Sequence, residues 1–207
     1  MNSVNISADC SDDEIAGWIA SQLKAKLDAS TAPLAIALPG GSTPFPILGL
    51  LVKHDLAWER IIAYPTDDRL VAEDHPASNT GKLRNLLEPA GAKVQALQLD
   101  ARPPHFGLVW LGMGADGHIA SLFPNTDPQV DDPAPIRRLT PDPLPPEAPF
   151  DRITLTFPAL LACDGLMLVI RGDDKRAVLE NALASDNDLP ITRLMRARGH
   201  IPITCFV

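Results

Sequence analysis

Hydrophobic residues in this chain form short apolar runs that alternate with stretches of helical periodicity. Runs that are apolar almost throughout, such as residues 106–111 and 165–170, are typical of strands buried on both faces of a sheet. Residues 152–157 instead alternate polar and apolar positions, which is typical of a strand with two different faces. The predicted strands are residues 33–38, 60–64, 94–99, 106–111, 152–157, 165–170 and 201–207.

Helices are predicted between these strands. The clearest one begins at a capping box formed by Ser11 and Glu14, after which apolar residues recur at every fourth position from Ile15 to Leu27. Further helices are predicted around residues 44–51, from the Ser78-Asn79 cap to residue 87, and around residues 173–183, and residues 119–122 can open another. Because strands and helices alternate from end to end, we expect an α/β fold with a mainly parallel, doubly wound sheet in a single domain, residues 1–207.

Composition limits the function classes. The chain has 207 residues, of which 45% are hydrophobic, enough for one sizeable core. A net charge of −8 disfavours nucleic acid as a partner, because a phosphate backbone needs clustered Lys and Arg, whereas a small phosphorylated substrate needs only a few donors. No apolar run approaches the ~18 residues of a membrane span, and the N-terminus lacks a signal-peptide pattern. We therefore expect a cytoplasmic protein with no membrane partner.

Cysteines and prolines add two expectations. Cys10, Cys163 and Cys205 are odd in number and widely spaced, which favours reduced structural thiols over disulfides or metal ligands. The 21 prolines are concentrated between Pro124 and Pro158, where we expect a long connection within the domain, because the α/β alternation continues on both sides. The chain has neither coiled-coil heptads nor an evidently exposed apolar helix, so a monomer is expected.

The loop after residues 106–111 combines glycines with an acid and a histidine. Glycines at positions 112, 114 and 117 let the backbone turn tightly. Asp116 and His118 lie within this turn, and ligands of open α/β sheets bind beyond the carboxyl ends of the strands. The loop therefore predicts an active site, although these residues alone equally allow a simple turn with His118 on the surface.

A second glycine-rich loop follows the predicted strand at residues 33–38. Gly40 and Gly41 let backbone N–H groups approach a ligand closely, and Ser42 or Thr43 supplies a hydroxyl ahead of a helix. Free N–H groups at a helix N-terminus form a natural anion site. The alternative is that Ser42 or Thr43 only caps the helix.

Charged residues follow two other predicted strands. Asp67, Asp68 and Arg69 lie just past residues 60–64, where a charge run forms either a solvated loop or part of a site. Lys175 lies in the first turn of a predicted helix, where the helix dipole disfavours a cation. Such local conflicts tend to mark sites, but an exposed lysine explains the position equally well.

The chain resembles 6-phosphogluconolactonases in three segments: ALPGGSTP at 37–44, DDRLV at 67–71 with the later Ser78-Asn79, and LGMGADGHIASLFP at 111–124. RITLTFPAL at 152–160 and GDDKRAVLENAL at 172–183 resemble the C-terminal half of that family. The resemblance implies a three-layer α/β/α sandwich with a mainly parallel, Rossmann-like sheet. It also implies hydrolysis of 6-phospho-D-glucono-1,5-lactone in the oxidative pentose phosphate pathway, with no metal or organic cofactor.

The same superfamily includes ribose-5-phosphate isomerase and glucosamine-6-phosphate deaminase, and the deaminase is the main alternative. It usually reads DGHIAFNEP, with a glutamate that falls at Phe123 here, and it has Asp-Glu-Tyr where this chain has Asp67-Asp68-Arg69. Ile119 is deaminase-like, since lactonases more often have Thr there. The missing glutamate favours the lactonase.

Two features depart from the lactonase pattern. Asp68 replaces the usual Glu before the arginine, which keeps the charge. The segment between Ser78 and His105 is short, so the helix that normally precedes the central strand is expected to be missing, and residues 125–150 match poorly. These gaps motivate a hypothesis from another class, a non-catalytic sugar-phosphate-binding protein on the same fold.

The resemblance and the chemistry of lactone opening together assign roles. Hydrolysis needs a base that activates water, and a histidine side chain, which titrates near neutral pH, suits this role. We assign it to His118, oriented by Asp116 or by a nearby backbone carbonyl. Substrate and phosphate contacts are predicted for Gly40, Gly41, Ser42, Thr43, Asp68, Arg69, Arg152 and Lys175, and no residue is predicted to bind a metal. The expected partner is a small sugar-phosphate lactone.

Overall fold

The structure is a computed structural model that describes residues 4–142, 144, 149–184 and 187–207. The predicted proline-rich connection therefore falls partly outside the described residues, at 143 and 145–148. The helices are α1 (Asp12–Ala29), α2 (Pro44–Leu51), α3 (Asn79–Leu87), α4 (Phe157–Leu161), α5 (Asp173–Ala184) and α6 (Pro190–Ala197), with 3-10 turns at Trp58–Arg60, Glu88–Ala90 and Pro124–Thr126. The strands are β1 (Val4–Ser7), β2 (Leu34–Leu38), β3 (Ile61–Pro65), β4 (Asp67–Arg69), β5 (Lys93–Val94), β6 (Leu108–Leu111), β7 (Ile136–Leu139), β8 (Arg152–Leu155), β9 (Leu166–Val169) and β10 (Ile203–Phe206). In the described part of the chain, no helix has both the length and the apolar character to cross a membrane.

Seven parallel strands form the main sheet, in the order β1-β10-β9-β6-β2-β3-β5. From β2 the chain runs outward through β3 to β5. It then returns with β6 to the other side of β2 and continues outward through β9 and β10. The connections that leave the carboxyl ends of β2 and β6 therefore diverge, and the crevice between them is where ligands bind in sheets of this type. The mainly parallel, doubly wound sheet predicted from the sequence is confirmed.

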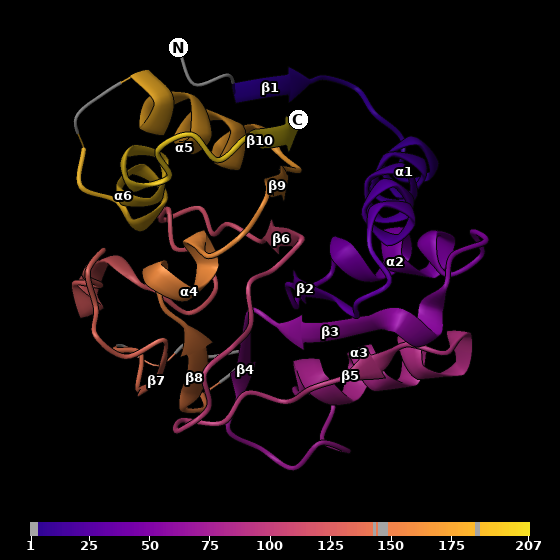
Figure 1. Ribbon diagram of the computed structural model, residues 1–207. Coiled ribbons are helices and arrows are strands. Elements are labelled where there is room, and N and C mark those ends of the chain that lie inside the picture. The colour runs from indigo at the N-terminus through magenta and orange to yellow at the C-terminus, as the bar shows by residue number, and fades with distance from the viewer. Residues whose placement is uncertain (1–3, 143, 145–148, 185–186) are drawn as a thin grey trace.

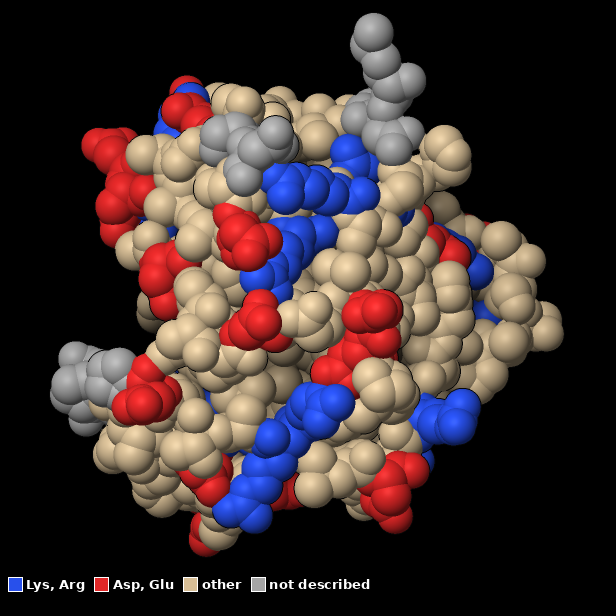
Figure 2. Space-filling model, turned by 90° about the vertical axis from the view of Figure 1, so that its left-hand side faces the viewer, with Lys and Arg blue, Asp and Glu red and all other residues tan. Residues whose placement is uncertain are grey.

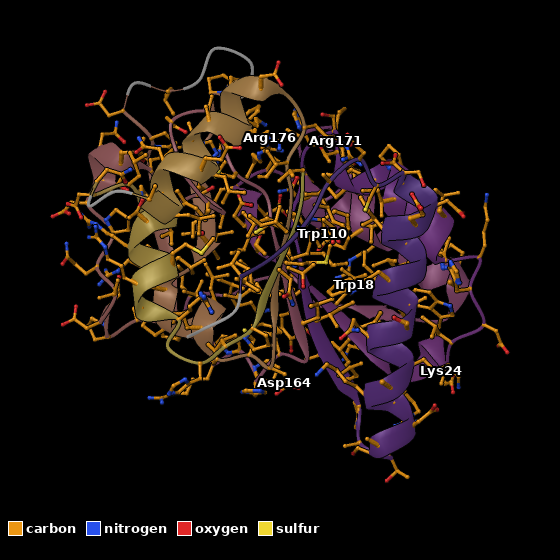
Figure 3. The ribbon with its side chains drawn as sticks, turned by 90° about the horizontal axis from the view of Figure 1, so that it is seen from above. Trp18, Lys24, Trp110, Asp164, Arg171 and Arg176 are labelled. Atoms are coloured by element: carbon orange, nitrogen blue, oxygen red, sulfur yellow. The ribbon has the colours of Figure 1, made fainter. Side chains whose placement is uncertain are left out.

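Helices cover both faces of this sheet and make three layers (Figure 1). α1, α2 and α3 pack on one face, and α4, α5 and α6 pack on the other. Along β6, Leu108 and Trp110 join the first of these cores, whereas Val109 and Leu111 join the second, and each of the four is at most 4% exposed. Seen from above, Trp110 lies between the two helical layers (Figure 3). The predicted α/β/α sandwich and the burial of this strand on both faces are confirmed.

Helix starts agree with the predicted caps at α1 and α3. Oγ of Ser11 accepts the N–H of Glu14 at 3.3 Å, and the carboxylate of Glu14 accepts the N–H of Ser11 at 2.9 Å, which completes the capping box. At α3 the cap is Ser78, whose Oγ accepts the N–H of Gly81 at 3.0 Å. Asn79 is the first residue of the helix and does not cap it.

A second, three-stranded antiparallel sheet, β4-β8-β7, lies beside the main one (Figure 1). β4 follows directly after β3, and the N–H of Leu155 in β8 donates to the carbonyl of Thr66 at 2.9 Å, which joins the two sheets. The predicted strand at 152–157 belongs here and ends at Leu155. The sequence pattern does not predict this sheet, because β4 and β7 are too short to show a period.

Two local predictions are wrong. The segment predicted to open a helix after His118 is a loop, in which Ile119 forms isolated antiparallel bridges with Met113 and Leu122. Ala120 has a left-handed φ of 49°, which a right-handed helix cannot contain, so the chain folds back toward its glycines. The strand predicted at 94–99 is only Lys93–Val94, after which the chain reaches β6 without a helix, as expected.

Leu168 tests the packing of the sheet, because it lies in β9 and is fully buried. Leu168→Ala removes buried atoms and leaves a cavity, so the free energy of unfolding measured with urea should fall by about 2–5 kcal/mol. Leu99→Ala is the control, because Leu99 is 53% exposed and its truncation should change this free energy by less than about 0.5 kcal/mol. Equal effects of the two substitutions would contradict the described core.

Candidate active site

A cavity of about 390 Å³ opens at the carboxyl ends of the central strands, where Pro39 follows β2, Thr66 follows β3 and Gly112 follows β6. This is the crevice expected from the order of the strands. The predicted site residues that line it are Gly40, Gly41, Ser42, Thr43, Arg69, His118, Arg152 and Lys175. Segments from both halves of the chain therefore meet at one place.

Asp116 and His118 form a hydrogen-bonded acid–histidine pair at this cavity. Nδ1 of His118 lies 2.6 Å from Oδ1 of Asp116, which also accepts the backbone N–H of His118 at 3.3 Å. The hydrogen bond from His118 holds the pKa of Asp116 below its ordinary value, so the carboxylate is ionised at neutral pH and can only accept. In the neutral imidazole, Nδ1 therefore carries the proton, and Nε2 has the lone pair. Of the two orienting groups that the sequence allows, the structure has the carboxylate.

The glycines of the histidine loop (residues 112–123) make room for this pair. A Cβ atom on Gly114 would lie 2.3 Å from Nδ1 of His118 and 2.5 Å from Oδ1 of Asp116, so a side chain there would displace both. The N–H of Gly114 donates to the carbonyl of His118 at 3.0 Å and closes the turn. Gly117, between the two members of the pair, has a φ of 78° that a side chain would strain. Asp116 does not line the cavity and reaches it only through His118.

The second glycine-rich loop presents backbone to the cavity. Thr43 occupies the N-cap position of α2, but its side chain makes no capping hydrogen bond. Gly41 turns the chain ahead of the helix with a φ of 95°. A Cβ atom on Gly40 would lie 2.0 Å from Oδ1 of Asn79, so this glycine lets α3 approach the loop. Pro44 and Pro46 have no N–H, so the donors that this loop can offer to an anion or to a polar ring oxygen are the N–H groups of residues 40–43.

Three cations, which we term the basic group (Arg69, Arg152 and Lys175), line the cavity. Arg69 and Arg152 are opposite each other in the β4–β8 register. Arg152 is only 3% exposed, and its burial, together with the nearby charge of Arg69, lowers its pKa. In the described residues, the buried Nε of Arg69 has no hydrogen-bond partner. Like charges side by side in a partly buried site are costly, and a bound anion would compensate this repulsion.

Asn79 connects α3 to Arg69 and to β4. Its Oδ1 accepts from Nη1 of Arg69 at 3.1 Å, and its Nδ2 donates to the carbonyl of Asp67 at 2.8 Å. Nη1 of Arg69 also donates to the carbonyl of Ala77 at 3.0 Å. The protein thus holds the guanidinium by Nη1, and in the described residues Nη2 has no protein partner and remains for a ligand. Asn79, which the sequence indicates only as part of a cap, is a positioning residue of the site.

The structure does not bring Asp68 to the cavity. Its carboxylate is 6% exposed and accepts the N–H groups of Asn79 at 2.6 Å and of Thr80 at 2.9 Å. These bonds lie at the first turn of α3, where a carboxylate compensates the free N–H groups and the helix dipole. Asp68 therefore anchors α3 behind the site.

Asp67 occupies the place at the cavity that the sequence predicts for Asp68. It lines the cavity, and its Oδ2 accepts from Oγ of the buried Ser121. Successive side chains of a strand point to opposite faces, so Asp67 and Arg69 share one face of β4 and Asp68 has the other. This alternation identifies Asp67 only once β4 is known to be a strand, which its three residues do not show in the sequence. Ser121 has no sequence signal either, because its role depends on a partner distant in the chain.

The two buried cysteines do not add a nucleophile to the cavity. Burial raises the pKa of the Cys163 and Cys205 thiols to about 12, so neither supplies a thiolate, and both are free, as predicted. In the portion of the chain that the structure describes, no group of three or more His, Cys, Asp or Glu side chains is arranged to hold a metal ion.

The fold and the position of the cavity define an α/β enzyme whose site is built from loops at the carboxyl ends of parallel strands. The chain matches the family model described as "Glucosamine-6-phosphate isomerases/6-phosphogluconolactonase" over residues 7–98 and 88–202. It therefore belongs to the glucosamine-6-phosphate isomerase/6-phosphogluconolactonase family. The resemblance found in the sequence motifs is confirmed.

Individual relatives agree with this assignment. The chain is 33% identical to a 6-phosphogluconolactonase of Pseudomonas aeruginosa, over 88% of this chain and 86% of the relative. It is 34% identical to one of Pseudomonas putida, over 91% and 84%. A crystal structure of a 6-phosphogluconolactonase from Shewanella baltica superposes with a TM-score of 0.83 at 28% identity, covering 99% of this chain and 97% of that one. These relatives bear the name of a lactone hydrolase, which agrees with the enzyme class that the motifs predict.

The bond between Asp116 and His118 can be tested by titration. Because this hydrogen bond is the main cause of the low pKa of Asp116, His118→Ala should raise that pKa toward its ordinary value, as measured by carbon NMR of the carboxyl group. A carboxylate whose folded pKa is lowered stabilises the fold above its unfolded pKa, and this stabilisation is lost as the pH falls through the folded pKa. The parent protein should therefore lose more stability than the variant below about pH 4.

His105→Ala is the control for this titration. Nε2 of His105 lies 2.6 Å from Oδ1 of Asp164, so His105 is also paired with an aspartate but does not line the cavity. It should leave the pKa of Asp116 unchanged. An Asp116 titration that is the same in the parent, His118→Ala and His105→Ala would contradict the assigned bond.

Proposed function

We propose that this protein hydrolyses 6-phospho-D-glucono-1,5-lactone to 6-phospho-D-gluconate. Family membership and the relatives named 6-phosphogluconolactonase support this reaction. The observation that carries the proposal is the position of His118, whose Nδ1 is bound to Asp116 while its ring lines the same cavity as the basic group. A base beside an anion site is what hydrolysis of a phosphorylated lactone requires.

His118 is the general base of the proposed reaction. Its Nε2 takes a proton from water as the water oxygen attacks the lactone carbonyl carbon, and Asp116 stabilises the imidazolium that forms. The tetrahedral intermediate then collapses, the bond from the carbonyl carbon to the ring oxygen breaks, and His118 returns the proton to that oxygen. One water is consumed, and the carboxylic acid that forms ionises at neutral pH.

The donors of the cavity hold the charges of the substrate and of the intermediate. We assign the phosphate to Arg69 and Lys175, because a guanidinium binds phosphate oxygens through a planar fork and Nη2 of Arg69 has no partner in the described structure. The oxyanion is assigned to the remaining donors, Arg152 and the backbone N–H groups of residues 40–43. Asp67 is then an acceptor for the sugar hydroxyls.

Deaminase chemistry is the alternative within the same family. The rings of His118 and Phe123 pack with their centroids 4.7 Å apart, so an aromatic side chain lies against the histidine where the deaminase motif has a glutamate. A phenylalanine cannot exchange a proton with the imidazole. This contact favours lactone hydrolysis.

We further propose that the enzyme acts in the oxidative pentose phosphate pathway of the cytoplasm, as a monomer. Hydrolysis transfers no electrons, and the base, the anion donors and water account for each step, so we propose no metal or organic cofactor. The acidic net charge of −8 with a local basic group suits a small phosphorylated substrate rather than nucleic acid.

The reaction is tested by generating the lactone in situ from glucose 6-phosphate and measuring its loss with and without protein, after subtraction of the spontaneous rate. Loss of a general base typically costs ~10²–10⁴-fold, so His118→Ala should lower kcat by this factor and leave the fold intact. His105→Ala should retain the parent kcat. A higher KM for His118→Ala with an unchanged kcat would contradict the assignment of the base.

Two further measurements separate the alternatives. Release of ammonia from glucosamine 6-phosphate would make the protein a deaminase. Binding of 6-phosphogluconate without turnover of either substrate would make it a binding protein on an enzyme fold.

Arg69→Lys tests the phosphate assignment, because it keeps the charge but removes the planar fork. A lost charge-assisted hydrogen bond is worth about 1.5–3 kcal/mol, so KM should rise ~10–100-fold with little change in kcat. Lys175→Ala should also raise KM. Arg84→Lys is the control, because Arg84 binds Glu73 and Glu88 outside the cavity. An unchanged KM for Arg69→Lys would contradict the assignment, and a fall in kcat alone would move Arg69 to the oxyanion.

A further inference from the structure

The N-terminal part of α6 and the residue before it lie against the histidine loop. Leu189 and Ile191 contact Gly117 within that loop, and Arg193 binds the segment that follows it. Figure 1 shows α6 beside the chain that leads from β6 toward β7. We term Leu189, Ile191 and Arg193 the buttress. None of the three lines the cavity.

Leu189 fills the space beside Gly117. A Cβ atom on Gly117 would lie 2.9 Å from Cδ1 and 3.0 Å from Cβ of Leu189, so the leucine packs directly against the backbone of the loop. The N–H of Ile191 donates to the carbonyl of Gly117 at 3.1 Å. Gly117 stands between Asp116 and His118 in the sequence, so a shift at this position moves both.

Arg193 holds the chain just after the loop. Its side chain is 17% exposed, and Nη1 donates to Oδ1 of Asp127 and to the carbonyl of Pro128, both at 2.7 Å. Nε and Nη2 bind the two carboxylate oxygens of Asp188 at 2.9 Å and 2.5 Å. Asp127 has a left-handed φ of 44° at the end of the turn Pro124–Thr126, a conformation that aspartate adopts more readily than most residues.

Arg193 forms ion pairs with two aspartates of its own chain, Asp127 and Asp188, whose side chains are exposed. Figure 2 shows the face that carries α5 and α6, on which acidic and basic side chains lie next to one another. Hydrogen bonds to Asp188 and Asp127 raise the pKa of Arg193, so the guanidinium stays charged and bound to these carboxylates. Its role is to tie α6 to the segment that follows the histidine loop.

The hydrogen bond between Asp116 and His118 does not fix the orientation of the pair relative to the cavity. Its members are two residues apart and bond to each other within one turn, so their hydrogen bond survives a rigid movement of that turn. Only contacts with the rest of the protein determine where Nε2 points. At the cavity such a contact comes from Ser121, whose N–H donates to Oγ1 of Thr154 at 3.2 Å, and away from the cavity it comes from the buttress.

We propose that Leu189 and Arg193 are positioning residues, which hold the acid–histidine pair at the angle needed for proton transfer without touching the substrate. The inference rests on the proposed function, because that function makes His118 the base. A misplacement of ~1 Å in an active site can cost ~10²-fold in rate, so loss of the buttress should lower kcat by about 10–100-fold. KM depends on the basic group, with which the buttress shares no hydrogen bond or ion pair in the described residues, and should stay close to the parent value.

Leu189→Ala and Arg193→Gln remove the buttress at its two ends. Arg193→Lys is the conservative variant and should recover part of kcat, because it keeps a charge for Asp127 and Asp188. Leu183→Ala and Arg84→Gln are the matched controls: Leu183 is 38% exposed, and Arg84 binds two acids, as Arg193 does, but on the surface of α3. Both controls should retain the parent kcat and KM at a temperature at which every variant is folded.

Amide hydrogen exchange provides a readout that does not depend on activity. The N–H groups of Gly114 and Gly117, both bonded within the turn, should exchange faster in Leu189→Ala and Arg193→Gln, while those of β6 should be unchanged. A general loss of stability would instead accelerate exchange in β6 as well, and that result would overturn the proposal.

A kcat within twofold of the parent in both variants, or a fall in kcat that only follows the unfolded fraction, would also overturn the proposal. If the parent protein does not hydrolyse the lactone, the proposed function fails, and hydrogen exchange then decides on the buttress alone. Faster exchange confined to the histidine loop would support it, and unchanged exchange would overturn it.

Discussion

Complete burial of β6 is the constraint on which the site depends. Its residues pack against helices on both faces, so no polar group of the reaction can lie within the strand without a large desolvation cost. The chemistry is therefore confined to the point where the chain leaves the sheet, and the diverging connections after β2 and β6 set that point. Glycines at 114 and 117 then let Asp116 and His118 share one tight turn.

The small antiparallel sheet brings two positively charged side chains of the site close together, which is electrostatically unfavourable. The β4–β8 register places Arg69 opposite Arg152, and burial makes two neighbouring cations unfavourable. Asp67 and Asp68 offset part of this repulsion, and Asn79 holds Arg69 in place. A bound anion would offset the remaining cost.

Predictions from local sequence patterns were confirmed where residues close together in the chain determine the structure. The capping box at Ser11, the apolar runs of β6 and β9 and the glycine turn before His118 depend on near neighbours, and each lies where the sequence predicts it. Predictions failed where bridges within a loop, or partners in another strand, outweigh the intrinsic helix and strand preferences of the residues. The segment after His118 contains good helix formers, yet Ile119 pairs with Met113 and Leu122, and β4 and β7 are too short to be recognised without β8 between them.

The sequence by itself determined the fold class and most of the residues that line the cavity. The hydrophobic periods of strands and helices, the glycine turns and the family motifs can each be recognised within a short stretch of sequence. Only the tertiary structure decided that Asp67 and not Asp68 faces the cavity, that Nδ1 of His118 is bonded to Asp116, and that α6 packs against the histidine loop. The physical reason is that a polar side chain takes its role from its hydrogen-bond partners. Those partners are set by the register of strands and the packing of helices that lie far apart in the chain.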